Sequence, residues 1–386
     1  MTSDHFDLRL ALGGLLSLAV AMGIGRFAYT PLLPEMMAAV PLSSSAAGLI
    51  ASSNFLGYLI GALAAALPIF SRQRRVLLLA LAASGATTAM TAMSSELSVL
   101  LAIRFAGGVA SAFVFVFASS LVLARLHAVG RPNLVAVHFA GVGTGIAASA
   151  AFLAILSVVG IGWRGDWLAL GAVSMMAFPA VARLLGPEPT GHQEAREPAR
   201  PLGLTRSLAA LITAYGLFGF GYVITATFLV AIVRATPEMQ VLERAIWVLF
   251  GLAAIPSVTL WTWFAGRVGI LVAMALACIV EAIGVAASVL VPSLAGAILA
   301  SMFLGGTFVG ITALGLVGAR SLSNSDPARV TALMTGSFGA GQIIGPAFAG
   351  LVVEVTGNYV MPTLVAALAL LVAAGLSFGI ERSRRP

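Results

Sequence analysis

The sequence carries little charge, and none of its positive charge comes from lysine. Only 9% of the 386 residues are charged, whereas a soluble domain keeps about a quarter of its residues charged. All 21 basic residues are arginines, which excludes the lysine of a phosphate-binding P-loop and a Schiff-base lysine. The chain therefore lacks the means for ATP-driven work of its own, and water is not its main solvent.

Cysteine and histidine are also scarce. The single cysteine, Cys278, lies in an apolar stretch, so a disulfide framework and a cysteine-based metal site are excluded. The four histidines are scattered along the chain, at His5, His127, His138 and His192. Because no histidine cluster or carboxylate pair occurs within an apolar segment, we expect no metal, no cofactor and no enzymatic activity.

Apolar residues, in contrast, make up 60% of the chain, together with 42 glycines. A helix that crosses a membrane needs about 20 consecutive apolar residues, and the sequence offers twelve such runs. We predict spans near residues 8–36, 44–70, 75–94, 97–126, 132–160, 165–186, 207–234, 242–266, 268–291, 293–321, 328–356 and 359–380. The fold class predicted is an all-α integral membrane protein with twelve transmembrane helices.

The first run is interpreted as a retained helix rather than a cleaved signal peptide. Its leader, with Asp4, His5, Asp7 and Arg9, is not clearly positive, and the apolar run continues past Arg26. We therefore count this run as the first of the twelve spans.

The longest polar stretch divides the chain into two parts. Residues 187–206 contain four prolines and mixed charge, a composition typical of a solvated linker. This predicts an N-terminal six-helix bundle over residues 1–186 and a C-terminal six-helix bundle over residues 207–386.

The arginines are distributed unevenly between the predicted loops. Sixteen fall in the loops and ends on the side of both termini, three fall in loops on the other side, and Arg26 and Arg104 fall within spans. The positive-inside rule therefore predicts that both termini are cytoplasmic. Since the arginines form no single stripe with interleaved aromatic residues, we expect the lipid bilayer and not a nucleic acid as the partner.

Three short segments recur after a shift of nearly 200 residues. Residues 23–26 (GIGR) match 219–222 (GFGY), residues 104–108 (RFAGG) match 302–306 (MFLGG), and Gly141 and Gly145 match Gly341 and Gly345. Such a repeat predicts two pseudo-symmetric bundles that rock about a site at their interface. We expect the four glycines to let helices approach closely, and Pro346 to bend the eleventh helix.

These segments resemble the major facilitator superfamily over nearly the whole chain. Residues 100–108 (LLAIRFAGG) resemble the arginine motif of its fourth helix, which implies a role for Arg104 in proton coupling. Residues 341–346 (GQIIGP) resemble its Gly-Pro hinge motif. That motif usually marks the fifth helix of exporters, and here it lies in the eleventh, so the direction of transport stays open.

The loop after the second span carries a further partial match. Residues 70–75 (FSRQRR) keep the cations of the family's DRxGRR core but lose its aspartate, and the resemblance implies a cytoplasmic gate at Arg72, Arg74 and Arg75. Residues 23–34 (GIGRFAYTPLLP) and 51–58 (ASSNFLGY) resemble more specifically the poorly characterised bacterial YbfB/YjiJ-type branch. This implies a multi-pass protein of a bacterial inner membrane and suggests no firm substrate.

Arg26 and Arg104 are the strongest candidates for a substrate site. An unpaired arginine at mid-membrane costs about 2.5–3.5 kcal/mol on insertion scales, so each must face protein, water or an anion. No acidic residue of the first half lies at their depth. We therefore expect both to attract a carboxylate or similar anion, the alternative being bonds to backbone carbonyls or to Glu281.

Uncharged polar residues near these arginines are further candidates for substrate contacts. Amide and phenol groups could orient a polar ligand in an otherwise apolar cavity. Such groups lie at Tyr29, Asn54, Tyr58, Tyr222 and Gln342. Hydrogen bonds between helices are the alternative role for each of them.

Two titratable residues within spans are, beside Arg104, candidates for proton coupling. His138 lies on the same helix face as Gly141 and Gly145, and Glu281 lies midway along the ninth span. For both, a buried hydrogen bond to a neighbouring helix is the alternative.

The function expected is proton-coupled secondary transport of a small organic solute by a monomer, with an anionic substrate preferred. Efflux of amphiphiles by the same fold is the alternative, followed by a membrane sensor that does not transport. The apolar, aromatic-containing helices are compatible with both kinds of transport.

Overall fold

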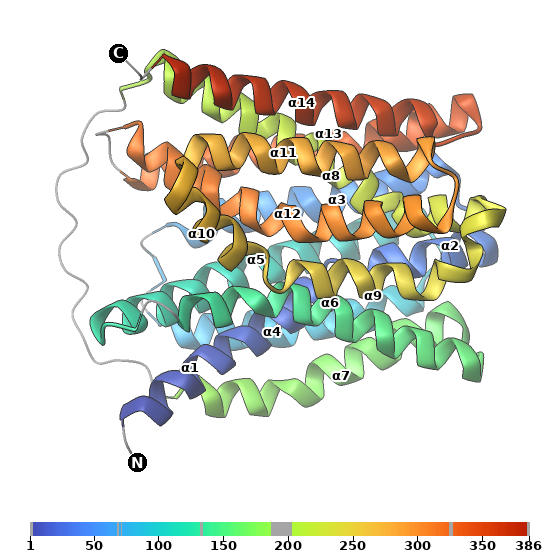
Figure 1. Cartoon of the computed structure of the whole chain (residues 1–386). Coiled ribbons are helices and arrows are strands. Elements are labelled where there is room, and N and C mark those ends of the chain that lie inside the picture. The colour runs from blue at the N-terminus through green and yellow to red at the C-terminus, as the bar shows by residue number, and fades with distance from the viewer. Residues whose placement is uncertain are drawn as a thin grey trace.

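The computed structural model describes residues 3–67, 69–70, 72–131, 134–186, 203–323 and 327–383. Over these ranges every regular element is a helix (Figure 1). The helices are α1 (Ser3–Leu18), η1 (Ala19–Ile24), α2 (Tyr29–Ala39), α3 (Ser44–Ala65), α4 (Gln73–Met90), η2 (Thr91–Met93), α5 (Leu97–Ala128), α6 (Leu134–Val159), α7 (Gly162–Leu184), α8 (Arg206–Ala235), η3 (Pro237–Leu242), α9 (Glu243–Ala254), α10 (Ser257–Val268), α11 (Ile270–Leu290), α12 (Leu294–Ser321), α13 (Pro327–Thr356) and α14 (Val360–Arg382).

The helices are long and apolar enough to cross a membrane. Eleven segments of the described chain meet this condition singly, and the pair Pro237–Ala254 and Ser257–Val268, bent by 44°, makes a twelfth if it is counted as one span. The prediction of an all-α membrane protein is confirmed, and the twelve predicted spans correspond to these eleven segments and the bent pair. The eighth span was predicted as one run, and it is bent where Pro256, just before α10, cannot continue a regular helix.

Local sequence explains where several helices begin and end. Ser43 and Thr205 precede α3 and α8, and their side chains accept hydrogen bonds from the backbone N–H groups of Ala46 and Leu208. Such caps satisfy donors that a helix leaves free at its start. After α6 the chain turns at Gly160, whose φ of 74° favours glycine over other residues.

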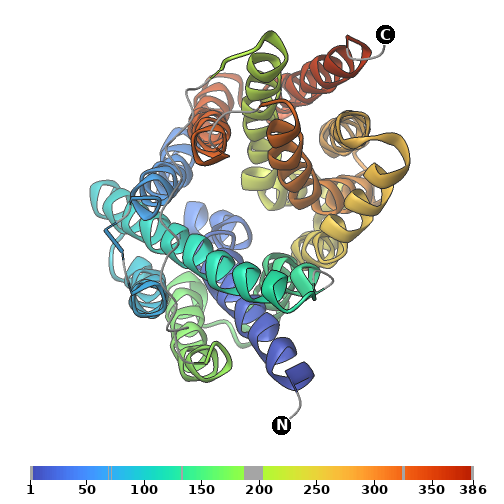
Figure 2. The ribbon, with the colours of Figure 1, turned by 90° about the vertical axis from the view of Figure 1, so that its left-hand side faces the viewer.

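The elements lie in two groups, which we call the N-terminal half (α1–α7) and the C-terminal half (α8–α14). Figure 1 shows α1, α4 and α7 of the first group at the bottom and α11, α13 and α14 of the second at the top, and Figure 2 shows both groups from the side on which α1 begins and α14 ends. We call this side the termini end. Residues 187–202 of the predicted linker lie outside the described chain, so the boundary between the predicted domains stays a prediction.

Hydrogen bonds join the two halves in the part of the molecule away from the termini end. Thr30 of α2 donates to the carbonyl oxygen of Ala226 at 2.8 Å, and Ser52 of α3 donates to that of Ile343 at 2.7 Å. The backbone N–H of Ser45 also donates to the Glu354 carboxylate at 3.0 Å. These bonds hold α2 and α3 against α8 and α13.

Glycines bring backbones together at several crossings. A Cβ added to Gly141 or Gly145 would overlap the backbone of Leu15 or Ala19, so α6 packs directly on α1 and η1. Similarly, Gly341 touches the backbone of Gly216, and Gly345 packs on Val223 and Phe220 of α8. Helix α13 continues through Pro346, whose carbonyl group faces Gly48. A role for these residues in conformational change stays a prediction.

The first span is one segment, Asp7–Ala39, as predicted, but its α-helix is interrupted in the middle. The chain leaves α1, passes through the π-helix η1 and a turn at residues 25–28, and resumes as α2. In this stretch Gly25 and Phe27 bond to carbonyl groups five residues back, those of Val20 and Met22. Pro31 contributes to the break because it has no N–H group to donate to the turn before it. The break lies at Arg26.

Candidate functional site

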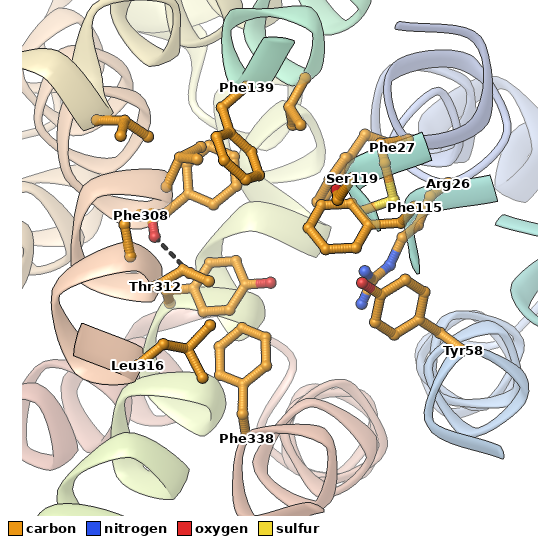
Figure 3. A pocket seen from close by; sticks show the side chains of 16 residues that line it. Arg26, Phe27, Tyr58, Phe115, Ser119, Phe139, Phe308, Thr312, Leu316 and Phe338 are labelled. Atoms are coloured by element: carbon orange, nitrogen blue, oxygen red, sulfur yellow. Dashed lines mark hydrogen bonds between the residues drawn. The ribbon is translucent and has the colours of Figure 1, made fainter. Parts of the chain in front are cut away.

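A cavity of about 260 Å³ lies between the two halves, on the termini side of the bonds that join them. Figure 3 shows the side chains of the 16 residues that line it. Arg26, Phe27 and Tyr222 are buried at its deep part, whereas Phe115 and Phe338 are half-buried. The cavity therefore becomes more accessible toward the termini end.

Arg26 lies at the deep part of the cavity and contacts both halves. Its Nη2 donates to the Gln342 side-chain oxygen at 2.9 Å, and the Gln342 amide donates in turn to the Tyr222 hydroxyl. The Arg26 guanidinium lies 3.9 Å from the ring centroid of Tyr58 and 4.7 Å from that of Phe55. Arg26, which lies at the helix break of the N-terminal half, is thus connected by hydrogen bonds to Gln342 and Tyr222 of the C-terminal half.

One charged side chain lines the cavity. Arg26 is the only charged side chain among the 16 that line the cavity. It is 5% exposed, and its Nε has no hydrogen-bond partner within the described part of the chain. Aromatic faces attract a cation but do not neutralise it, so Arg26 contributes a positive charge to this part of the cavity.

Arg104 is close to Arg26 but does not line this cavity. Its two terminal nitrogens donate to the carbonyl oxygens of Gly25 at 2.9 Å and Arg26 at 3.0 Å. Within a membrane, backbone groups at a helix break need partners from neighbouring helices. Arg104 supplies two such donors. This matches the alternative that the sequence left open, in which the arginine bonds to backbone carbonyls and does not bind an anion.

Two other candidates lie with Arg104 at a pocket of only about 10 Å³, which Arg26 also lines. Tyr29 donates its hydroxyl to the Ala47 carbonyl at 2.9 Å, and the Asn54 amide donates to the Arg104 carbonyl at 2.8 Å. The structure thus brings Tyr58, Tyr222 and Gln342 to Arg26, and it puts Tyr29 and Asn54 into bonds between helices. A substrate contact for any of these residues stays a prediction.

The two titratable candidates are both buried. His138 has its Nε2 3.0 Å from the hydroxyl of Ser119, which lines the cavity, and its Nδ1 has no partner in the described chain. Glu281 is fully buried in α11, and neither carboxyl oxygen has a hydrogen-bond partner among the residues described. The Thr307 hydroxyl faces this carboxyl group but bonds to the carbonyl of Phe303.

The three arginines of the implied cytoplasmic gate lie at the start of α4, at the termini end. Arg74 donates to the Ala182 carbonyl of α7 at 2.8 Å, and Arg72 and Arg75 are exposed. None of them is among the residues that line the cavity. A gating role stays a prediction.

Sequence reasoning missed most of the aromatic lining. Phe115, Phe308 and Phe338 line the cavity, and none of them was a candidate. A signal was present, because Phe338 precedes the candidate Gln342 by four residues and therefore shares its face of α13. In a chain this apolar, phenylalanines with the same spacing also occur on helix faces that contact lipid, so the spacing alone does not identify a cavity.

The chain matches a family model described as "Uncharacterised MFS-type transporter YbfB" over residues 18–378. The chain belongs to this family of transporters. The resemblance to the major facilitator superfamily and to its YbfB-type branch is thereby confirmed. No curated protein matches the sequence of this transporter.

Solved structures support the fold. A mutant of the nucleoside transporter NupG is 16% identical with a TM-score of 0.74, and the match covers 98% of this chain and 100% of that chain. A bacterial homolog of the human lysosomal transporter Spinster is 14% identical with a TM-score of 0.70, and the match covers 99% and 98%. At these identities the likeness shows a shared fold alone.

Proposed function

We propose that this transporter moves a small organic anion across a bacterial inner membrane by alternating access, coupled to protons. The observation that carries the proposal is the position of Arg26. It is the only charged residue lining a cavity between two halves, and its hydrogen bonds lead into the other half through Gln342 and Tyr222. A carboxylate is the natural partner for a buried guanidinium that has donors to spare.

The arrangement of contacts supports alternating access. The halves are bonded away from the termini end and enclose a cavity toward it. With both termini cytoplasmic, as the arginine distribution favours, this state exposes the cavity to the cytoplasm. Rocking of the halves about the level of Arg26 would open the opposite side.

Proton coupling is assigned to Glu281, with His138 as the second candidate. A buried carboxyl group without a partner is a candidate for binding and releasing a proton within a membrane. Glu281 is close enough to Tyr222 to act on it electrostatically, and Tyr222 belongs to the chain of bonds that ends at Arg26. Arg104 is the weakest of the three, because both its terminal nitrogens are engaged by backbone carbonyls.

Efflux of amphiphiles is a second candidate function. The observation that favours it is the lining itself, in which apolar side chains surround the single arginine. An exporter and an importer can share this site, so the direction of transport follows from the coupling and not from the lining.

Distances between spin labels test alternating access without knowledge of the substrate. The labels are attached to cysteines introduced in a Cys278→Ala background. The first pair, Ala39→Cys with Met361→Cys, lies away from the termini end. The second pair, Ala128→Cys with Ser321→Cys, lies at the termini end. All four positions are exposed. We expect each pair to show two populations that respond in opposite senses to pH. A single unresponsive population at both pairs would contradict transport and favour a static membrane protein.

A further inference from the structure

Aromatic rings are concentrated around the cavity far beyond their share of the chain. Seven of the 16 lining residues are aromatic, whereas aromatic residues make up 8% of the sequence. They come from both halves: Phe27, Tyr58, Phe115 and Phe139 from the first, and Tyr222, Phe308 and Phe338 from the second. A ligand between the halves is therefore met by rings on two sides.

The rings of the second half are aligned. The Tyr222 ring makes an interplanar angle of 3° with that of Phe338 at 5.8 Å, and an angle of 13° with that of Phe308 at 5.7 Å. In Figure 3 Phe338 and Leu316 lie across an open space from Phe115, Tyr58 and Arg26. Rings with a common orientation present a surface that suits a flat ligand.

Few polar groups of the cavity remain available to a ligand. The Thr312 hydroxyl donates to the Phe308 carbonyl at 2.8 Å, and the Ser119 hydroxyl is bonded to His138. A solute with many hydroxyl groups would lose its bonds to water here without replacing them. Beside the hydroxyl groups of Tyr58 and Tyr222, the remaining polar group is the Arg26 guanidinium, the one charged group among the described residues that line the cavity.

We propose that the substrate class of this site is a planar aromatic monocarboxylate of one or two rings. The carboxylate would pair with Arg26, and the ring system would lie between the aromatic side chains of the two halves. The cavity volume of about 260 Å³ is just below the range of about 300–1,000 Å³ usual for small-molecule sites, which favours a small ligand. A single positive residue matches a single negative charge.

This inference rests on the proposed function and narrows it, because that function specifies only an organic anion. Charge and ring are recognised by different residues, so they can be tested separately. A ligand without the negative charge should lose its ion pair with Arg26, and a ligand with saturated rings should lose its stacking on the aromatic side chains. Neither change alters the size of the molecule much.

The experiment measures binding to the purified, full-length protein by calorimetry and by the shift in thermal unfolding temperature. The probe is 2-naphthoate, compared with 2-naphthamide (neutral), decahydronaphthalene-2-carboxylate (saturated), 2-naphthylmethylamine (cationic) and uridine (a neutral nucleoside). We expect 2-naphthoate to bind about tenfold or more tightly than each of the others. Equal or tighter binding of any of them would overturn the proposal, and so would the absence of 2-naphthoate binding.

Variants assign the two preferences to residues. Arg26→Gln should remove the preference for naphthoate over naphthamide, and Arg26→Lys should keep part of it. Phe338→Leu should reduce the preference for the aromatic over the saturated acid. Ser157→Ala, whose hydroxyl bonds only within α6 to Ala154, is the control and should change neither preference. If Arg26→Gln does not fold, the ligand series on the unaltered protein and Phe338→Leu still decide the proposal.

The outcome is separable from that of the spin-label experiment. Two populations in the label distances without binding of 2-naphthoate would reject the substrate class and leave alternating access standing. Binding of 2-naphthoate with a single immobile state would reject transport and leave an aromatic acid site.

Discussion

Arg104 donates a hydrogen bond to the backbone carbonyl of Arg26, 3.0 Å away, and a second one to that of Gly25. The two arginines appear equivalent in the sequence, since both are charges within spans. In the structure the side chain of Arg104 supports the backbone from which the side chain of Arg26 extends into the cavity. Their replacement should therefore have different consequences.

We expect Arg104→Met to lower the stability of the protein and Arg26→Met to affect chiefly ligand binding. A hydrogen bond to a charged group contributes about 1.5–3 kcal/mol, and Arg104→Met loses two at a helix break. The measurement is the thermal unfolding temperature of the purified protein, followed by tryptophan fluorescence. Unchanged stability with lost ligand binding in Arg104→Met would show instead that Arg104 contacts the substrate.

The sequence predicts the spans well and identifies Arg26 as a charge within a span, and for a clear physical reason. Apolar runs and isolated charges are local signals whose cost in a membrane is large. The break at Arg26 is harder to predict, because its carbonyl groups are satisfied by Arg104, 78 residues away. The aromatic lining is hidden for a related reason: phenylalanine faces lipid as readily as a cavity, and only the packing of both halves distinguishes the two.

Gly145→Ala should destabilise the N-terminal half. Its Cβ would overlap the backbone of Ala19 in η1, and overpacking of this kind costs about 1–3 kcal/mol. The measurement is the thermal unfolding temperature together with the yield of monodisperse protein. Gly375→Ala is the matched control, because nothing lies within 4 Å of its added Cβ. An equal effect of both substitutions would mean that helix propensity, and not the crossing of α6 with η1, is responsible.

Thr30→Val combined with Ser52→Ala should shift the protein toward the state that is open away from the termini end. Each residue donates one hydrogen bond across the halves, and together these contribute about 1–3 kcal/mol, which corresponds to about a 5- to 150-fold change in the population ratio. The readout is the distance distribution of labels at positions 39 and 361. Thr262→Val, whose hydroxyl bonds within α10, is the control. An unchanged distribution in the double variant would mean that these bonds form in both states.

Glu281→Gln should uncouple the conformational equilibrium from protons. The amide matches the shape of a protonated carboxyl group but cannot release a proton, so the variant should hold one label-distance distribution as the pH changes, whereas the unaltered protein should respond. A histidine side chain can also bind and release a proton, and His138→Gln is therefore the companion variant, expected to keep the response. If Glu281→Gln keeps the response and His138→Gln loses it, the coupling site is at His138, beside Ser119 and the cavity.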